Sequence, residues 1–162
     1  MTGINYKDAK PSINGHKISY RQYKTMQADY QRSRFYGEEY GGILTKDGRV
    51  IRAPSAYKSE YDVIFSSEWT GAVASDEVLT HYHTHWDSIN SFAGYDSAGK
   101  PQFTAFGPSD ADRLFIQQNE LFAKEGILID RLNIYYYNSK VDTYICRNYI
   151  LGFFPFLFPY FQ

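Results

Sequence analysis

Between Ser19 and Phe35, apolar and aromatic positions recur three and four residues apart, a spacing typical of an amphipathic helix. Gly37 follows this stretch and favours helix termination, because glycine readily adopts the left-handed conformation found after a last turn. The pattern therefore predicts a first helix that ends before Gly37. Its buried positions are Tyr20, Tyr23, Met26 and Tyr30, and its solvated face carries Arg21, Lys24, Arg32 and Arg34.

Strand-like patterns follow this helix. Apolar runs on both sides of Asp47-Gly48 predict a β-hairpin within 39–54, with the type I′ turn that this residue pair favours because both positions tolerate positive φ. Segments 61–67 (YDVIFSS) and 77–85 (EVLTHYHTH) predict two further strands. On the second, the two-residue period of a strand places one set of side chains on a common face. This set is Leu79, His81, His83 and His85.

The second half of the chain begins with a stretch that lacks a sustained period. Residues 86–107 are rich in Gly, Ser and Asp, so we expect a long loop there. Helical spacing returns after Ser109 and predicts a second helix that stops at Gly126. Segment 127–149 then predicts two strands around Asn138-Ser139-Lys140.

The order helix, hairpin, strands, helix, strands predicts an α/β (α+β) fold, a mixed sheet flanked by two main helices. The chain has 162 residues, of which 43% are hydrophobic and 22% charged, values typical of one compact domain. We divide it into an N-terminal segment (1–18), a domain (19–148) and an aromatic tail (149–162). The tail is too short to span a bilayer as a helix and contains Pro155 and Pro159, so we expect it to pack on the domain. Contact with a partner, a membrane surface or a parent polypeptide is the alternative.

Charge and cysteine content exclude several kinds of site. With 17 basic and 18 acidic side chains and a net charge of -1, the chain lacks the electrostatic pattern of a nucleic-acid binder. Cys146 is the only cysteine, which excludes an intrachain disulfide and a cysteine-based zinc site. Neither a signal peptide nor a transmembrane segment is expected. The localisation stays open between the cytoplasm and delivery by a non-classical bacterial route.

The most unusual feature is HYHTH at 81–85, which holds three of the four histidines of the chain. Imidazole is costly to bury, and three neighbouring rings would repel one another if protonated. A strand with a merely structural role does not need such a cluster. The pattern therefore predicts a binding site, with histidine nitrogens and carboxylate oxygens as the available metal ligands.

Five positions in order resemble the signature of the JAB/MPN/Mov34 metalloenzymes, the JAMM metallopeptidases. That signature has a glutamate before a Gly-containing apolar strand, then His-x-His at a strand end, then Ser-x-x-Asp at a helix start. The corresponding residues here are Glu39, His83, His85, Ser109 and Asp112. The EYGGI and YHTH motifs are also similar to those of a branch of this family found in Rhs-associated and other bacterial polymorphic-toxin proteins. Trp86 replaces the usual proline, and 23 residues separate His85 from Ser109, more than the family usually has.

The resemblance implies a role for each position. His83, His85 and Asp112 would hold one zinc ion (Zn2+) per chain, because two imidazoles and one carboxylate leave a coordination position open for water. Glu39 would be the general base, and Ser109 would donate a hydrogen bond to the developing oxyanion. Three further residues could support the ligands without binding the ion themselves, namely His81, Trp86 and Glu38.

Alternatives exist for several of these roles. Ser109-x-x-Asp112 also matches a helix-capping box, and the capping and catalytic roles can coexist at a helix start. His81 is an alternative third ligand, and Glu38 is an alternative to Glu39. Less favoured replacements for Asp112 are Asp110, Asp87 and Asp96.

The resemblance implies a zinc-dependent metallopeptidase or isopeptidase that hydrolyses a protein or peptide amide bond, as an effector or toxin domain. Expected partners are the protein or peptide substrate, a parent Rhs or toxin protein, an immunity protein and a chaperone. Segment 86–107 would be a lid or specificity loop at the rim of the site. Two other functions are considered: a metal-dependent nuclease toxin and a non-catalytic MPN-like protein-binding module.

Overall fold

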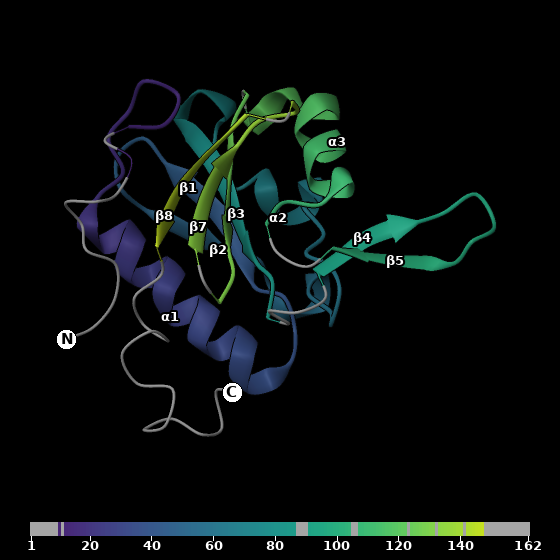
Figure 1. The fold of residues 1–162 in the computed structure, drawn as a ribbon. Coiled ribbons are helices and arrows are strands. Elements are labelled where there is room, and N and C mark those ends of the chain that lie inside the picture. The colour runs from purple at the N-terminus through teal and green to yellow at the C-terminus, as the bar shows by residue number, and fades with distance from the viewer. Residues whose placement is uncertain are drawn as a thin grey trace.

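A six-stranded mixed sheet forms the centre of the molecule (Figure 1). The computed structural model describes Lys10 and residues 12–86, 91–104, 107–122, 124–131, 133–140 and 142–147, and the structural statements below concern these residues. The strand order is β2-β1-β3-β6-β7-β8. All neighbours are antiparallel except β3 and β6, which run parallel. The bounds are β1 Gly41–Thr45, β2 Val50–Arg52, β3 Val78–Thr84, β6 Gly126–Ile129, β7 Asn133–Tyr137 and β8 Thr143–Arg147.

The remaining elements surround this sheet. They are α1 Tyr20–Tyr36, η2 Ser55–Tyr57, α2 Ser67–Thr70, η3 Ser75–Glu77, β4 Ser91–Tyr95, β5 Pro101–Thr104, α3 Asp110–Gln118 and η4 Glu120–Phe122. The mixed sheet with its flanking helices confirms the predicted α+β class. No helix in the described part of the chain is both long and apolar enough to cross a membrane.

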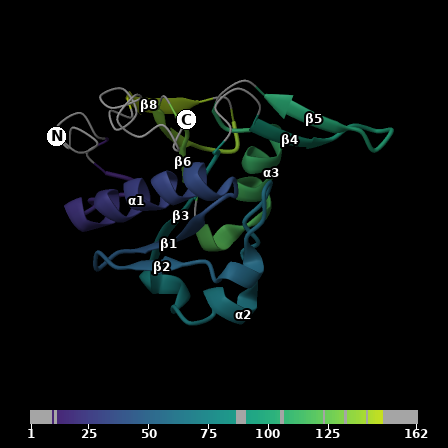
Figure 2. The ribbon, with the colours of Figure 1, turned by 90° about the horizontal axis from the view of Figure 1, so that it is seen from below.

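Helix α1 follows the sequence prediction closely. Ser19 caps its start by a reciprocal pair of hydrogen bonds with Gln22, and Gly37 ends it in the left-handed conformation, with a φ of 64°. Tyr23, Met26 and Tyr30 are buried against the sheet, as the periodicity predicted, whereas Tyr20 is exposed. The helix lies along the sheet, away from α3 (Figures 1 and 2).

The two faces of the sheet carry separate hydrophobic clusters. The α1 face packs aliphatic and tyrosine side chains from β1, β3, β6 and β7, together with Cys146 of β8 and with Ile13 and Ile18 from the segment before the helix. The opposite face packs Ile43 and Val78 with Trp69 of α2 and Phe122 of η4. Residues 12–18 thus contribute to the core. The predicted tail, 149–162, lies outside the described residues, as do residues 1–9.

The predicted hairpin at 39–54 is present, but its turn differs from the predicted type. Leu44 pairs with Val50, the N–H of Gly48 donates to the carbonyl of Thr45, and only Gly48 has a positive φ, at 91°. This is a three-residue loop closed by Thr45 and Arg49, which needs one left-handed residue instead of two. The prediction of a type I′ turn was therefore wrong.

Segment 61–67 was predicted as a strand and is not one. Val63 forms only an isolated bridge with Lys58, and α2 begins at Ser67. Local hydrogen bonds replace a strand ladder here, since Ile64 N–H donates to the carbonyl of Tyr57. Ser66 then caps α2, and Trp69 is buried. Val63 and Phe65 of this segment pack in the cluster on the face opposite α1, whereas Tyr61 and Ile64 are exposed.

The second helix ends earlier than predicted. It stops at Gln118, a 3-10 turn follows at 120–122, and Gly126 begins β6 instead of terminating a helix. A Cβ at Gly126 would lie 2.6 Å from Cε1 of His81, so glycine at this position provides space for that imidazole. The two strands predicted around residues 138–140 are β7 and β8. They are preceded by β6, which the sequence analysis missed.

Segment 86–107 contains regular structure that was not predicted. β4 and β5 form a two-stranded hairpin beside α3 that projects from the rest of the molecule (Figure 1). Asp96 supports the turn, because its carboxylate accepts hydrogen bonds from the N–H groups of Ala98 and Lys100. The prediction of an unstructured loop was therefore wrong for 91–104.

Candidate metal centre

Strand β3 carries HYHTH through the middle of the sheet, between β1 and β6. His81, His83 and His85 point to the face opposite α1 and line one pocket. His85 lies just beyond the strand, where its N–H donates to the carbonyl of Ile129. Leu79 was predicted on the same face but packs in the α1 cluster. The reason is a register shift between Leu44 and Thr45, where Leu44 pairs with Thr80 and Thr45 with Val78, so that Leu79 is an extra residue.

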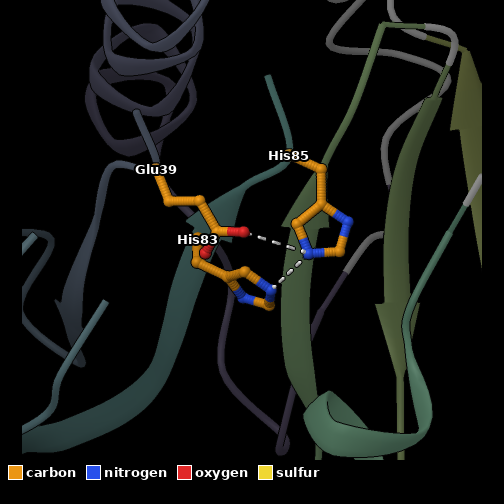
Figure 3. A group of neighbouring side chains, drawn as sticks. All are labelled: Glu39, His83 and His85. Atoms are coloured by element: carbon orange, nitrogen blue, oxygen red, sulfur yellow. Dashed lines mark hydrogen bonds and ion pairs between the residues drawn. The ribbon is translucent and has the colours of Figure 1, made fainter. Parts of the chain in front are cut away.

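The two later histidines converge on one carboxylate. Their Nε2 atoms are 3.2 Å apart. Oδ1 of Asp112 is 3.0 Å from Nε2 of His83, and Oδ2 is 3.5 Å from Nε2 of His85. Glu39 approaches from the other side, with Oε1 3.8 Å from Nε2 of His85 (Figure 3). The side chains of four of the five signature residues, Glu39, His83, His85 and Asp112, therefore lie close together.

Glu39 is held just before β1. Its backbone N–H donates to the carbonyl of Ser59 at 2.8 Å, and its side chain is almost fully buried. Gly41 follows, and a Cβ there would lie 2.6 Å from the carbonyl oxygen of Tyr82, so glycine allows β1 to approach β3 closely. Burial, followed by the charges of Asp112 and Asp62, raises the pKa of Glu39 well above its usual value.

Asp112 and Ser109 lie at the start of α3, where capping and site geometry coincide. Ser109 Oγ accepts a hydrogen bond from the N–H of Asp112, and the Asp112 carboxylate accepts one from the N–H of Ser109. The predicted capping box is thus present. Burial alone would raise the pKa of Asp112, but the neighbouring His83 and His85 outweigh it and lower the pKa. Asp112 therefore presents an ionised carboxylate to the two imidazoles.

The electrostatics keep His85 neutral. Burial, which outweighs the attraction of Asp112, lowers the pKa of His85 to about 4. A neutral imidazole presents a lone pair, as a metal ligand must. Glu39, His83 and His85 lie close enough together to hold a metal ion, and Asp112 contacts both histidines. The site can therefore bind a metal through nitrogen and oxygen atoms.

The three candidates for a supporting role have different surroundings. His81 is buried next to Phe65, Phe115 and Phe122, and stands outside the group of potential ligands. Trp86 lies at the edge, where its Nε1–H donates to the carbonyl of Glu60 and its own carbonyl accepts from Arg34.

Glu38 lies away from the potential ligands, near Lys58 at 3.8 Å. Glu39, and not Glu38, therefore lines the pocket. Among the alternatives to Asp112, Asp110 and Asp96 are exposed, and Asp87 lies outside the described residues.

The pocket has further walls that the sequence analysis did not identify. They are Tyr61, Asp62, Val63, Phe65, Ala111, Phe115 and Tyr137. The pocket encloses about 210 Å³, less than the roughly 300–1,000 Å³ of typical small-molecule sites, which suits one side chain or a peptide group. Asp62 was not identified because its segment, 61–67, was predicted to be a strand. Nothing in the sequence marked Tyr137 among three consecutive tyrosines.

Comparisons with family models, with curated proteins and with solved structures returned no match for this chain. The resemblance to the JAMM metallopeptidases therefore stays a hypothesis based on the five signature positions and their arrangement.

Proposed function

We propose that this protein is a zinc-dependent metallopeptidase or isopeptidase of the JAMM type that hydrolyses an amide bond in a protein or peptide. The observation that carries the proposal is the convergence of His83, His85 and Asp112. Two donor atoms that are each 2.0–2.1 Å from a common zinc ion at tetrahedral angles lie about 3.3 Å apart. The Nε2 atoms of His83 and His85 are 3.2 Å apart, and the Asp112 carboxylate approaches them through different oxygens, with Oδ1 3.0 Å from His83 and Oδ2 3.5 Å from His85. The two imidazole nitrogens therefore have the separation that a shared tetrahedral ion requires, and the carboxylate lies beside both of them.

In this proposal His83, His85 and Asp112 hold the ion, since two neutral nitrogens and one carboxylate oxygen match the ligands of catalytic zinc sites. When bound, zinc would supply the Lewis acidity that activates water and polarises the substrate carbonyl. Glu39 lies in the segment before β1, with Oε1 3.8 Å from Nε2 of His85, and is itself close enough to His83 and His85 to contact an ion. The proposal assigns the ligand role to Asp112 and proton transfer to Glu39, as the sequence resemblance implies.

The two remaining signature residues have matching chemistry. Burial and the charges of Asp112 and Asp62 raise the pKa of Glu39, which makes its carboxylate a stronger base that can take a proton from water and return it to the leaving amine. Ser109 Oγ already accepts the capping hydrogen bond, so its hydroxyl proton remains able to donate to the carbonyl oxygen of the substrate. Ser109 thus combines the capping role with a second role in the pocket.

The charge of the pocket favours an amide substrate over a phosphodiester. Glu39, Asp62 and Asp112 line it, and no lysine or arginine is found among its described lining residues. Three carboxylates would repel a phosphate group, which argues against the nuclease alternative. A non-catalytic binding module would not need buried histidines and carboxylates at these separations. Toxicity, a parent Rhs protein, an immunity protein and a chaperone are hypotheses that rest on sequence resemblance alone.

The proposal is tested by Glu39→Gln, with Glu38→Gln as the matched control. Glutamine keeps the size of glutamate but cannot accept a proton, so turnover of peptide and lysine-isopeptide substrates should fall about 10²- to 10⁴-fold while zinc content persists. Glu38→Gln should retain activity, because that side chain faces Lys58. Both variants are assayed beside the parent for turnover and metal content. Parental activity in Glu39→Gln, or an inactive zinc-loaded parent across the whole panel, would contradict the proposal.

A further inference from the structure

His81 is the histidine that the proposed mechanism does not use. It is only 1% exposed, and the rings of Phe65, Phe115 and Phe122 surround it at centroid distances of 4.7–5.3 Å. A charged imidazole is very costly in such surroundings, so His81 is neutral and carries one N–H. Phenylalanine or leucine would fill an apolar space of this kind at lower cost. The polarity of this ring therefore needs an explanation.

The absence of a side chain at Gly126 leaves space for the His81 ring next to Tyr137. Gly126 pairs with Tyr137, and a Cβ on Gly126 would lie 3.1 Å from Nε2 of His81. Because Gly126 has no side chain, the His81 ring from β3 and the Tyr137 ring from β7 meet across β6. Their polar atoms, Nε2 of His81 and the hydroxyl oxygen of Tyr137, are 3.4 Å apart.

The position of the single imidazole proton decides what the tyrosine hydroxyl can do. Nδ1 of His81 has no hydrogen-bond partner among the described residues. A proton on Nδ1 would therefore be an unpaired buried N–H, which is rare and costly. A proton on Nε2 can instead be donated to the oxygen of Tyr137. In that tautomer Tyr137 accepts from His81, and its own O–H remains free to donate elsewhere.

The free O–H can donate into the pocket of the proposed site. Tyr137 is 1% exposed and lines the pocket that contains Glu39, His83 and Asp112. Its ring stands nearly perpendicular to that of His83, with centroids 6.4 Å apart.

We propose that Tyr137 is a substrate-contacting residue, a hydrogen-bond donor to the carbonyl oxygen of the substrate, and that His81 is its positioning residue. This inference rests on the proposed hydrolase function. Tyr137 would complement Ser109, which reaches the pocket from the start of α3. The remaining histidine of HYHTH then serves the site indirectly, because its Nε2–H donates a hydrogen bond to the hydroxyl oxygen of Tyr137.

The first test reads the tautomer directly, without a substrate. Imidazole ¹⁵N NMR of the zinc-loaded protein, with His81 assigned by loss of its signals in His81→Gln, should show a protonated Nε2 and an unprotonated Nδ1. A proton on Nδ1 would overturn the positioning role of His81. The tautomer tests the hydrogen bond itself, and the kinetic comparison in the second test separates the proposed role from simple space filling.

The second test removes the hydroxyl alone. Tyr137→Phe should keep the zinc content and lower kcat about 10²- to 10³-fold, the cost of one oxyanion donor, with a smaller change in KM. Tyr136→Phe is the matched control, because it also removes a buried tyrosine hydrogen bond, to Tyr23 on the α1 face. It should keep parental kcat. Equal kcat in Tyr137→Phe and an active parent would refute this inference alone, whereas a parent without zinc or activity would refute the proposed function.

Discussion

The polar groups on the two sides of strand β3 differ in their hydrogen-bond partners. On the α1 side, each hydroxyl group has a protein partner: Thr80 donates to the carbonyl of Glu125, Tyr82 to the carboxylate of Asp29, and Thr84 to the hydroxyl of Ser33. On the other side, Nδ1 of both His81 and His85 lacks a partner among the described residues, and two Nε2 atoms face each other. Alternate residues of one seven-residue strand thus have opposite roles.

The difference separates the polar groups that stabilise the fold from those that form the candidate metal site. A buried polar group left without a hydrogen bond costs about 1–3 kcal/mol, and the hydroxyl groups of β3 on the α1 side avoid this cost, whereas the Tyr30 hydroxyl and Nε2 of Gln27 on α1 itself lack a partner among the described residues. On the histidine side, the Nε2 atoms of His83 and His85 lie close to each other and to the Asp112 carboxylate, an arrangement that a bound ion would complete. Substitutions on the two sides should therefore affect different properties, stability on one side and metal binding or turnover on the other.

On the α1 side, Tyr82→Phe should have the largest effect on stability. It removes a hydrogen bond to the buried carboxylate of Asp29, and hydrogen bonds to charged groups contribute about 1.5–3 kcal/mol. Urea unfolding should show a free energy of unfolding lower by about that amount, with unchanged zinc content. Loss of zinc in a folded Tyr82→Phe protein would mean that the two sides are not separable.

On the histidine side, pH should reveal the cost of burial in the metal-free protein. Burial, followed by the charge of His83, lowers the pKa of His81 from 6.5 to about 3. The unfolded chain therefore takes up this proton first, so the contribution of His81 to stability is complete above pH 6.5 and is lost as the pH falls toward 3. Between about pH 7 and about pH 5, the parent should lose about 2 kcal/mol more than His81→Gln. Parallel pH profiles from urea unfolding would show that this histidine is not buried as a neutral ring.

The β4–β5 hairpin should have the smallest effect on stability and on metal content. Replacing residues 92–103 with a short Gly-Ser linker should change the free energy of unfolding by about 0.5 kcal/mol or less, because loop length has a weak entropic effect. Turnover of protein substrates should fall relative to short peptides, since the hairpin lies beside α3 between His85 and Ser109. An unchanged ratio of the two rates would make the hairpin a tolerated insertion.

The site was predictable from sequence to the extent that its residues lie on regular elements. His83 and His85 follow the alternation of a strand, and Ser109 with Asp112 follows the spacing of a helix cap, so both pairs were placed correctly. The position of Leu79 was not, because a register shift interrupts the alternation. Tyr137 and Asp62 reach the pocket only through the pairing of β6 with β7 and the path of a segment outside the sheet, both tertiary features.

The fold, like the site, was predictable where local sequence signals agree and not where tertiary packing decides the structure. Helix α1 was predicted because its cap, its period and its stop all agree. Gly126 was misread because glycine terminates helices and also leaves room for neighbours, and only the packed structure shows the imidazole of His81 beside it. The β4–β5 hairpin lacks the alternation of a half-buried strand, and its turn at residues 96–100 is exposed to solvent.

The measurement that tests the central claim most directly is elemental analysis of the purified protein beside a His83→Ala, His85→Ala double variant. Tyr82→Phe, which alters the α1 side of the same strand, is the control. The account predicts about one zinc per chain in the parent and in Tyr82→Phe, and none in the double variant. Full zinc occupancy in a folded double variant, or a parent that binds no metal after dialysis against zinc, would contradict it.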